Sequence, residues 1–178
     1  MINQKPSEIL EGNPFQIRES KVLTIEEVFQ IIEINKAVFE NESFYLTVES
    51  IQDFLSKESG VIFLAMLSGK IVGYSSCCLE SDAKDYFDGR EGGFSNDVLY
   101  FSELAIAGKQ GMGVFLKLFS SVLDKAKTLK VKKVSMHARK NNGLSDLIQK
   151  RYRATFVRAE SNFFGSGEDF DYLEILIN

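Results

Sequence analysis

The pattern of apolar and polar residues is most regular between residues 99 and 129. Residues 99–107 predict a strand, residues 108–113 a glycine-rich turn, and the stretch that follows a long helix. In that stretch apolar side chains recur at three- and four-residue spacing, which is the periodicity of an amphipathic helix. The stripe consists of Phe115, Leu118, Phe119, Val122, Ala126 and Leu129.

The first sixty residues predict two further helices. Thr24 followed by Glu27 is a capping-box signature, and it marks the start of a helix whose apolar stripe lies within residues 28–39. A second helix is expected to begin near Thr47 and to stop at Gly60.

Strands are predicted on both sides of these helices. Alternation over residues 15–19 indicates a first strand, whereas residues 1–13 lack periodicity and are expected to form a loose N-terminal arm. The uninterrupted apolar run at 61–67 suits a strand covered on both faces, and we expect it to pair with 71–79 in an antiparallel hairpin. A long acidic connection, 80–97, follows. Connections of this length are usually functional or mobile.

The remaining residues complete a β-α-α-β-β-β-α-β-α-β-β order. We expect a strand at 131–138, a helix at 142–150, and two closing strands at 155–164 and 172–177. No repeat or linker divides the sequence. The prediction is therefore an α/β (mixed α+β) fold in a single domain, 1–178, with a mixed central sheet and helices on both faces.

The composition narrows the function classes. The 178 residues carry a net charge of −4, which favours neither nucleic-acid nor membrane binding, and no apolar run approaches the length of a membrane span. A cytoplasmic location is expected. Cys77 and Cys78 are adjacent in a strand and point to opposite faces, so we expect two buried thiols. A single histidine argues against a His-based metal site.

The glycine-rich turn is a candidate phosphate-binding site. A glycine turn at a helix N-terminus presents free backbone N–H groups and the positive end of the helix dipole. The turn has the spacing Gly-x-x-Gly-x-Gly, which differs from the Gly-x-Gly-x-x-Gly of dinucleotide folds, and it lacks the Gly-Lys-Ser/Thr ending of a P-loop. Neither common phosphate-loop interpretation is supported.

The turn instead resembles the pyrophosphate loop of the GCN5-related N-acetyltransferase (GNAT) superfamily. That loop follows the pattern Arg/Gln-x-x-Gly-x-Gly/Ala, and residues 110–113 (QGMG) carry the match. Residues 104–106 (LAI) stand where the family has a Leu-x-Val strand end, and Asn142 stands where a family asparagine follows the fifth strand. The element order extends the resemblance over residues 15–177.

The resemblance implies acetyl-CoA as co-substrate and no metal. In such proteins the strand before the loop pairs with the pantetheine arm, the loop N–H groups bind the pyrophosphate, and the asparagine contacts the coenzyme arm or braces the loop. The cofactor-binding residues that it implies are Leu104, Ala105, Ile106, Gln110, Gly111, Met112, Gly113, Val114, Phe115 and Asn142. The reaction would be direct attack of a deprotonated amine on the thioester.

Two positions depart from the family pattern. Phe115 stands where glycine or alanine is usual, and it is interpreted either as a core residue or as a change to the coenzyme pocket. The family's leaving-group tyrosine falls seven residues after the asparagine, at Gln149 here. Tyr152 lies about one helical turn further on and is the candidate acid, although it could equally be a partly buried aromatic residue.

Glu103 is the candidate general base. Family members often use a carboxylate at this position, through water, and the alternative is an ordinary strand glutamate that points to solvent. Because Leu104 and Ile106 share one face of the strand, Glu103 is expected on the other face with Ala105. His137 is interpreted as a surface residue or as one that supports the site from behind.

The resemblance therefore implies an acetyl-CoA-dependent N-acetyltransferase that acts on a primary amine of a small molecule or protein. The alternatives are a catalytically silent module of the same fold and an acyltransferase that uses a longer acyl thioester. A homodimer is left open. The acidic connection favours a cationic acceptor such as a polyamine. Its acidic residues include Asp82, Asp85, Asp88, Glu91 and Asp97.

Overall fold

The computed structural model describes residues 15–84, 94–108 and 111–177. The expected N-terminal arm, Gln110 and three acidic residues of the long connection (Asp85, Asp88 and Glu91) lie outside the described residues.

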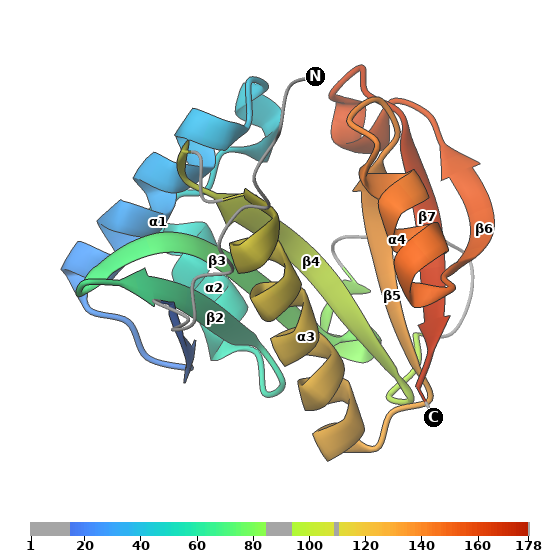
Figure 1. Ribbon diagram of the computed structural model, residues 1–178, viewed down its shortest axis with the longest axis horizontal. Coiled ribbons are helices and arrows are strands. Elements are labelled where there is room, and N and C mark those ends of the chain that lie inside the picture. The colour runs from blue at the N-terminus through green and yellow to red at the C-terminus, as the bar shows by residue number, and fades with distance from the viewer. Residues whose placement is uncertain (1–14, 85–93, 109–110, 178) are drawn as a thin grey trace, which may run out of the picture.

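One seven-stranded sheet runs through the described part of the chain, in the order β1-β2-β3-β4-β5-β7-β6 (Figure 1). Its strands are β1 (Gln16–Ser20), β2 (Val61–Leu67), β3 (Lys70–Leu79), β4 (Val98–Ile106), β5 (Lys133–Arg139), β6 (Thr155–Glu160) and β7 (Phe170–Leu176). Neighbouring strands are antiparallel except β4 and β5, which are parallel. The predicted element order and mixed sheet are confirmed.

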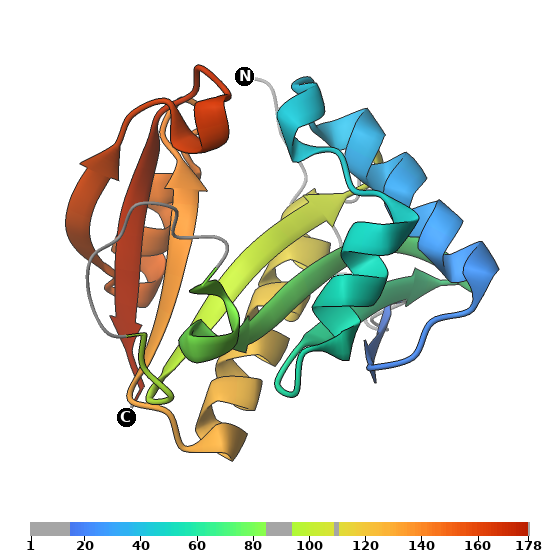
Figure 2. The same cartoon turned by 180° about the vertical axis from the view of Figure 1, so that it is seen from behind.

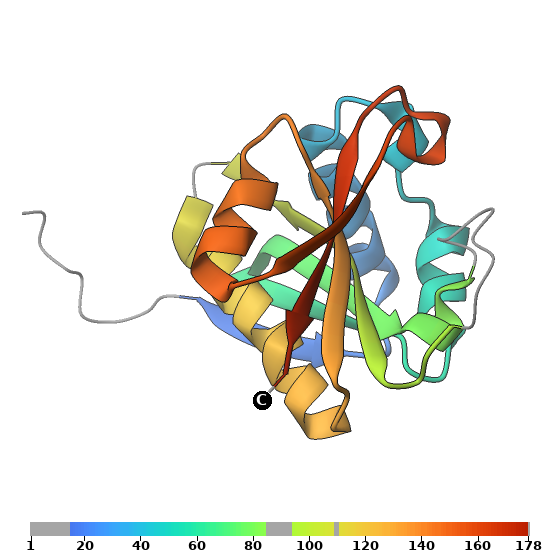
Figure 3. The ribbon, with the colours of Figure 1, turned by 90° about the vertical axis from the view of Figure 1, so that its right-hand side faces the viewer.

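Helices cover both faces of this sheet (Figures 2 and 3). They are α1 (Ile25–Val38), α2 (Val48–Ser56), α3 (Gly111–Leu129) and α4 (Leu144–Tyr152), with short 3-10 turns η1 (Glu42–Phe44), η2 (Glu80–Asp82) and η5 (Phe163–Gly165). One core cluster joins α3 and α4 to the sheet, and a second joins α1 and α2 to the other face. Both faces of the central strands are therefore buried.

The local signals behave largely as predicted. Thr24 Oγ1 accepts a hydrogen bond from the Glu27 N–H (3.3 Å), and Glu27 Oε2 accepts one from the Thr24 N–H (2.9 Å), so the capping box of α1 is complete. Cys77 and Cys78 are free, buried thiols, and burial raises the pKa of Cys78 to about 12. They belong to the two opposite core clusters, as strand alternation requires.

The closing hairpin differs from its prediction. β6 stops at Glu160 instead of continuing to residue 164, and β7 already begins at Phe170. The chain turns at Asn162, which has a left-handed backbone (φ 53°), and the Gly165 N–H donates to the Asn162 carbonyl at 2.8 Å. The turn therefore uses residues that the alternating pattern had assigned to the strand.

The parallel strands β4 and β5 stop pairing about halfway along their length. They pair only where Val98–Phe101 lies beside Lys133–Met136. Beyond this point, among the described residues, β4 pairs only with β3 and β5 pairs only with β7. The sheet thus opens in a V between its fourth and fifth strands (Figure 1).

A β-bulge in β4 lies at the start of the opening. Phe101 pairs with Cys77 and Glu103 pairs with Ser76, so Ser102 is an extra residue that has no partner in β3. Its Oγ lies 2.7 Å from the Ser76 Oγ. The extra residue shifts the alternation of the strand, with the result that the residues packed against the α3 side are Leu99, Phe101, Leu104 and Ile106.

Candidate active site

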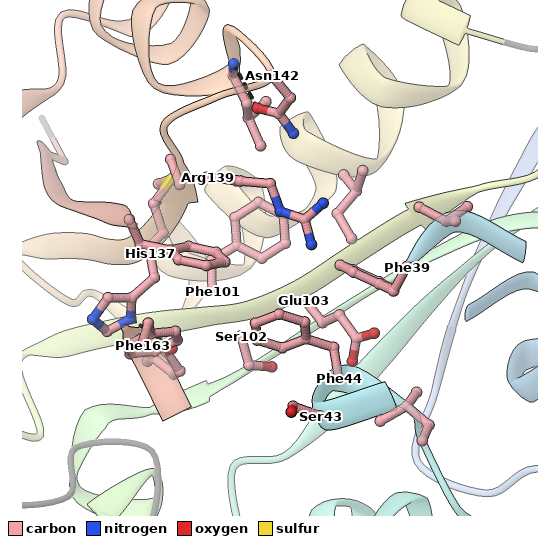
Figure 4. A pocket seen from close by; sticks show the side chains of 18 of the residues that line it. Phe39, Ser43, Phe44, Phe101, Ser102, Glu103, His137, Arg139, Asn142 and Phe163 are labelled. Atoms are coloured by element: carbon pink, nitrogen blue, oxygen red, sulfur yellow. Dashed lines mark hydrogen bonds between the residues drawn. The ribbon is translucent and has the colours of Figure 1, made fainter. Parts of the chain in front are cut away.

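A cavity of about 430 Å³ lies in the V between β4 and β5 (Figure 4). Residues 100–104 of β4 form one wall and residues 136–139 of β5 the other. The end of α1, η1 and the closing hairpin line one part of it, and the first turns of α3 and α4 line another. The walls are mostly apolar, with Glu103 and Arg139 as the acidic and basic side chains among them.

Glu103 is held by two side chains from different elements. Asn35 Nδ2, from α1, donates to Glu103 Oε1 at 2.5 Å, and the Tyr74 hydroxyl, from β3, donates to the same oxygen at 2.6 Å. Asn35 is fully buried, and its Oδ1 accepts from the Leu46 N–H at 2.9 Å. The carboxyl group is thus fixed on the α1 face, with no hydrogen bond to Oε2 among the described residues.

The environment of Glu103 shifts its proton affinity toward neutrality. Burial raises the pKa of the carboxyl from its usual 4.5 to about 7, against the opposing effect of the hydrogen bonds from Tyr74 and Asn35. A carboxyl of this kind exchanges a proton near physiological pH. That is the property that a general base for an amine requires.

The structure does not bring Tyr152 to Glu103. Leu144 and Ile148, on one stripe of α4, line the cavity, but Tyr152 continues that stripe beyond it. Its ring packs on Phe119 of α3 with the ring centroids 4.3 Å apart. Gln149, the alternative position, donates to the Ser145 hydroxyl at 3.0 Å and does not line the cavity either.

Phe115 is both a core residue and part of the cavity wall. Its side chain is buried in the α3 core cluster and stacks on Phe119, with the ring centroids 5.5 Å apart. It also forms part of the cavity wall. The large residue therefore fills core space and narrows the cavity at the same time.

Among the other predicted cofactor residues that the structure describes, Leu104 and Asn142 line the cavity, and the rest lie in β4 or at the start of α3. Ala105 and Ile106 follow Leu104 in β4. Gly111, Met112, Gly113 and Val114 open α3, a helix of 19 residues whose N-terminus carries the positive end of the dipole.

Gly111, Gly113 and Asn142 are predicted cofactor residues whose local geometry the structure defines. Gly111 has φ 52°, and a Cβ placed on Gly113 would meet no atom within 4 Å, so the helix start is open. Asn142 also lines the cavity, and its Oδ1 accepts from the Leu144 N–H at 3.0 Å, which caps α4.

His137 is buried, not on the surface. Its side chain is 3% exposed, its Nδ1 lies 2.9 Å from the Tyr100 hydroxyl, and its Nε2 lies 3.0 Å from Glu160 Oε2. The ring stacks on Phe163 at 4.1 Å between centroids. It therefore braces the cavity wall between β4, β5 and the closing hairpin.

Several residues of the site were not predicted from the sequence. They are Asn35, Tyr74, Arg139 and the phenylalanines Phe39, Phe44, Phe163 and Phe170. Asn35 carried a signal, because it is a polar residue close to the apolar stripe of α1. The phenylalanines carried none that separates a cavity wall from a core.

No group of three or more His, Cys, Asp or Glu side chains within 15–84, 94–108 and 111–177 is arranged to hold a metal ion. In the same ranges, every helix is too short or too polar to cross a membrane.

Comparisons with known proteins connect this geometry to one fold. The sequence matches no family model and no curated protein. Among solved structures, it is similar to Ard1 from Thermoplasma volcanium, with 16% identity, a TM-score of 0.70, and coverage of 93% of this chain and 99% of that one.

Two other solved structures are similar over comparable lengths. One is a GNAT family acetyltransferase from Elizabethkingia anophelis with acetyl-CoA bound (16% identity, TM-score 0.63, covering 93% of this chain and 99% of that one). The other is NAA60 from Arabidopsis thaliana in complex with a bisubstrate analogue (17% identity, TM-score 0.68, covering 92% and 100%). The chain therefore has the fold of the GNAT acetyltransferases.

Proposed function

We propose that this chain of GNAT fold transfers the acetyl group of acetyl-CoA to a primary amine. The observation that carries the proposal is Glu103, a carboxyl with a pKa near 7 fixed on the wall of a cavity that lies where two parallel strands separate. A carboxyl whose pKa lies near neutral pH, beside the gap where β4 and β5 no longer pair, suits amine attack on an extended thioester.

The coenzyme would lie along β4 and against the N-terminus of α3. Backbone groups of Leu104, Ala105 and Ile106 face a gap in which β5 no longer pairs with β4, so they are placed to bond the amides of the pantetheine arm. The N–H groups of residues 110–115 would bind the pyrophosphate with support from the helix dipole. Asn142 would hold the opposite side of the arm.

The proton balance of the reaction follows from these positions. The acceptor enters as an ammonium, and Glu103 takes one proton from it, directly or through a water molecule. The free amine then attacks the carbonyl carbon, a C–N bond forms, and the C–S bond breaks. The attacking nitrogen loses its second proton as the departing thiolate gains one, so the net products are the amide, free CoA and one proton released to solvent.

The departing thiolate needs a proton, and Tyr152 is one candidate for its source. Tyr152 stays a prediction, and its position against Phe119 argues for another donor. The thiol of CoA is acidic enough for CoA to leave as the thiolate anion. The thiolate then takes its proton from the amine or from water. We therefore propose a mechanism in which base catalysis by Glu103 is essential and a tyrosine acid is not.

The test combines binding with turnover. Calorimetry with acetyl-CoA is expected to show binding in the micromolar range or tighter, and a thiol-release assay with primary amines is expected to show turnover, with the acetylated product identified by mass. Octanoyl-CoA serves as the long-chain comparison. The absence of acetyl-CoA binding at millimolar concentration would contradict the proposal. Binding without turnover of any amine would favour a silent module.

A further inference from the structure

The two oppositely charged side chains of the cavity belong to the two strands that separate. Glu103 projects from β4 on one wall, and Arg139 projects from the end of β5 on the other (Figure 4). Apart from His137, which is held by Tyr100 and Glu160, the rest of the described lining is neutral. The cavity therefore presents one acidic side chain, Glu103, and one basic side chain, Arg139, to its occupant.

Arg139 has hydrogen-bonding capacity that the described chain does not use. Its Nε lies 2.7 Å from Glu168 Oε2, which occupies one edge of the guanidinium. Its Nη2 is buried and makes no hydrogen bond to any described residue. A buried charged donor without a partner is costly, so an acceptor atom placed against the other edge would be stabilising.

Aromatic rings hold this guanidinium in place. Its central carbon lies 5.5 Å from the ring centroid of Phe39, 5.7 Å from that of Phe44 and 5.9 Å from that of Phe170. These rings come from α1, η1 and β7, and they limit the access of water to the charge. An arginine that is oriented and partly desolvated is suited to bidentate binding of a carboxylate.

We infer, on the basis of the proposed function, that the acceptor is a small amino acid with an apolar side chain. Its ammonium group would lie at Glu103, its carboxylate at the free edge of Arg139, and its side chain against the phenylalanines. The amine of such an acceptor matches the Glu103 carboxyl on one wall, and its carboxylate matches the Arg139 guanidinium on the other.

The same geometry argues against a polycation. A second ammonium group near Arg139 would meet a like charge in a poorly hydrated place. The described acidic residues of the connection also have other partners. Glu80 accepts from the Tyr172 hydroxyl at 3.0 Å, Asp82 accepts from the Ser59 N–H at 3.1 Å, and Asp97 pairs with Lys132 at 2.5 Å. None of the three lines the cavity.

The experiment compares acceptors that differ in one group. L-phenylalanine, L-phenylalaninamide and 2-phenylethylamine share a ring and an amine, but only the first has a carboxylate. We expect L-phenylalanine to have the highest kcat/KM of the three by about tenfold or more, because one charged hydrogen bond contributes about 1.5–3 kcal/mol. Calorimetric titration of L-phenylalanine into the CoA-bound protein gives the same comparison without turnover.

Arg139→Gln is the decisive variant. It should raise KM for L-phenylalanine about 10- to 100-fold more than KM for 2-phenylethylamine, because only the amino acid has a carboxylate that loses the contact. Arg139→Lys should recover part of the preference, because it keeps the charge without the planar fork. Lys140→Gln, at the neighbouring exposed position, is the matched control and should behave as the native protein.

Each remaining outcome is also informative. An equal loss for all three acceptors in Arg139→Gln, or a loss of acetyl-CoA binding, would show a structural role and overturn the inference. Amine turnover in which the amide or 2-phenylethylamine equals the amino acid would overturn it and leave the acetyltransferase proposal intact. Binding of L-phenylalanine without turnover would instead contradict the proposed function and retain the acceptor site.

Discussion

At the scale of single residues, opposing effects of burial and hydrogen bonding set the pKa of Glu103. Burial raises its pKa, while the hydrogen bonds from Asn35 and Tyr74 stabilise the charged form and lower it. The net value, about 7, lies above the usual 4.5 for a glutamate. The group therefore keeps its proton between these two pH values and becomes a base only as the pH rises through about 7.

The first prediction concerns activity as a function of pH. If Glu103 is the base, kcat/KM should rise with pH through an apparent pKa of about 7. Glu103→Gln should lower kcat about 10²- to 10⁴-fold and remove that rise, because the amide cannot accept the proton. Glu26→Gln, an exposed carboxylate on α1, is the control. An unchanged pH profile in Glu103→Gln would assign the base elsewhere.

Tyr74→Phe tests the cause of the pKa. It removes a hydrogen bond to Oε1 while keeping the ring, so the pKa of Glu103 should rise further and the limb of the pH profile should move to higher pH. A profile that stays in place would mean that Tyr74 does not influence the base.

The sequence identifies Glu103 as a candidate base, but it does not identify the residues that hydrogen-bond to its carboxyl group and shift its pKa. Glu103 stands beside a strand end that is identifiable by its own neighbours. Asn35 lies 68 positions earlier in the chain, and nothing local to it specifies which strand residue its helix will meet. Arg139 was equally invisible as a site residue, because its role depends on rings contributed by three separate elements.

At the scale of elements, the direction of α4 explains the position of Tyr152. The helix starts beside the cavity at Leu144 and ends at Tyr152, where Arg153 adopts a left-handed backbone (φ 55°). The family spacing points to Gln149, about one helical turn before Tyr152, and neither residue lines the cavity. Tyr152 is on the same stripe as Ile148, one turn too far from the cavity.

The second prediction therefore concerns Tyr152→Phe. The variant keeps the ring that packs on Phe119, and the lost hydroxyl lies outside the described cavity, so kcat should stay within about twofold of the native value. A rate assay at saturating acetyl-CoA measures this. A decrease of about 100-fold with unchanged thermal stability would restore Tyr152 as the leaving-group acid.

The start of α3 gives the third prediction. Gly113 has open space where a side chain would begin, so Gly113→Trp should fold normally yet occupy the proposed pyrophosphate seat. Loss of even one charged hydrogen bond there would weaken acetyl-CoA binding about 10- to 100-fold. Thr128→Trp, at the exposed far end of the same helix, is the control. Native affinity in a folded Gly113→Trp would exclude this binding mode.

At the scale of the whole molecule, the order of elements was predictable and their spatial separation was not. Hydrophobic periodicity locates each helix and strand, because each buries one face or stripe. The gap between β4 and β5 depends instead on pairing that stops at Phe101 and Met136, and on one extra residue, Ser102. Past that point both strands carry polar residues, Ser102 and Glu103 in β4 and His137 and Arg139 in β5, but polar residues alone do not mark where two strands stop pairing.

The opening also places two unpaired strand edges inside the sheet. Exposed edges invite the strands of other proteins, and outer edges are commonly protected by charge, twist or brevity. Here the inner edges of β4 and β5 are still joined at Val98–Phe101 and Lys133–Met136. A wedge closed at one end admits a single extended chain but excludes the broad face of a foreign sheet. The gap between β4 and β5, which suits the extended thioester proposed above, thus also protects the protein from edge-to-edge aggregation.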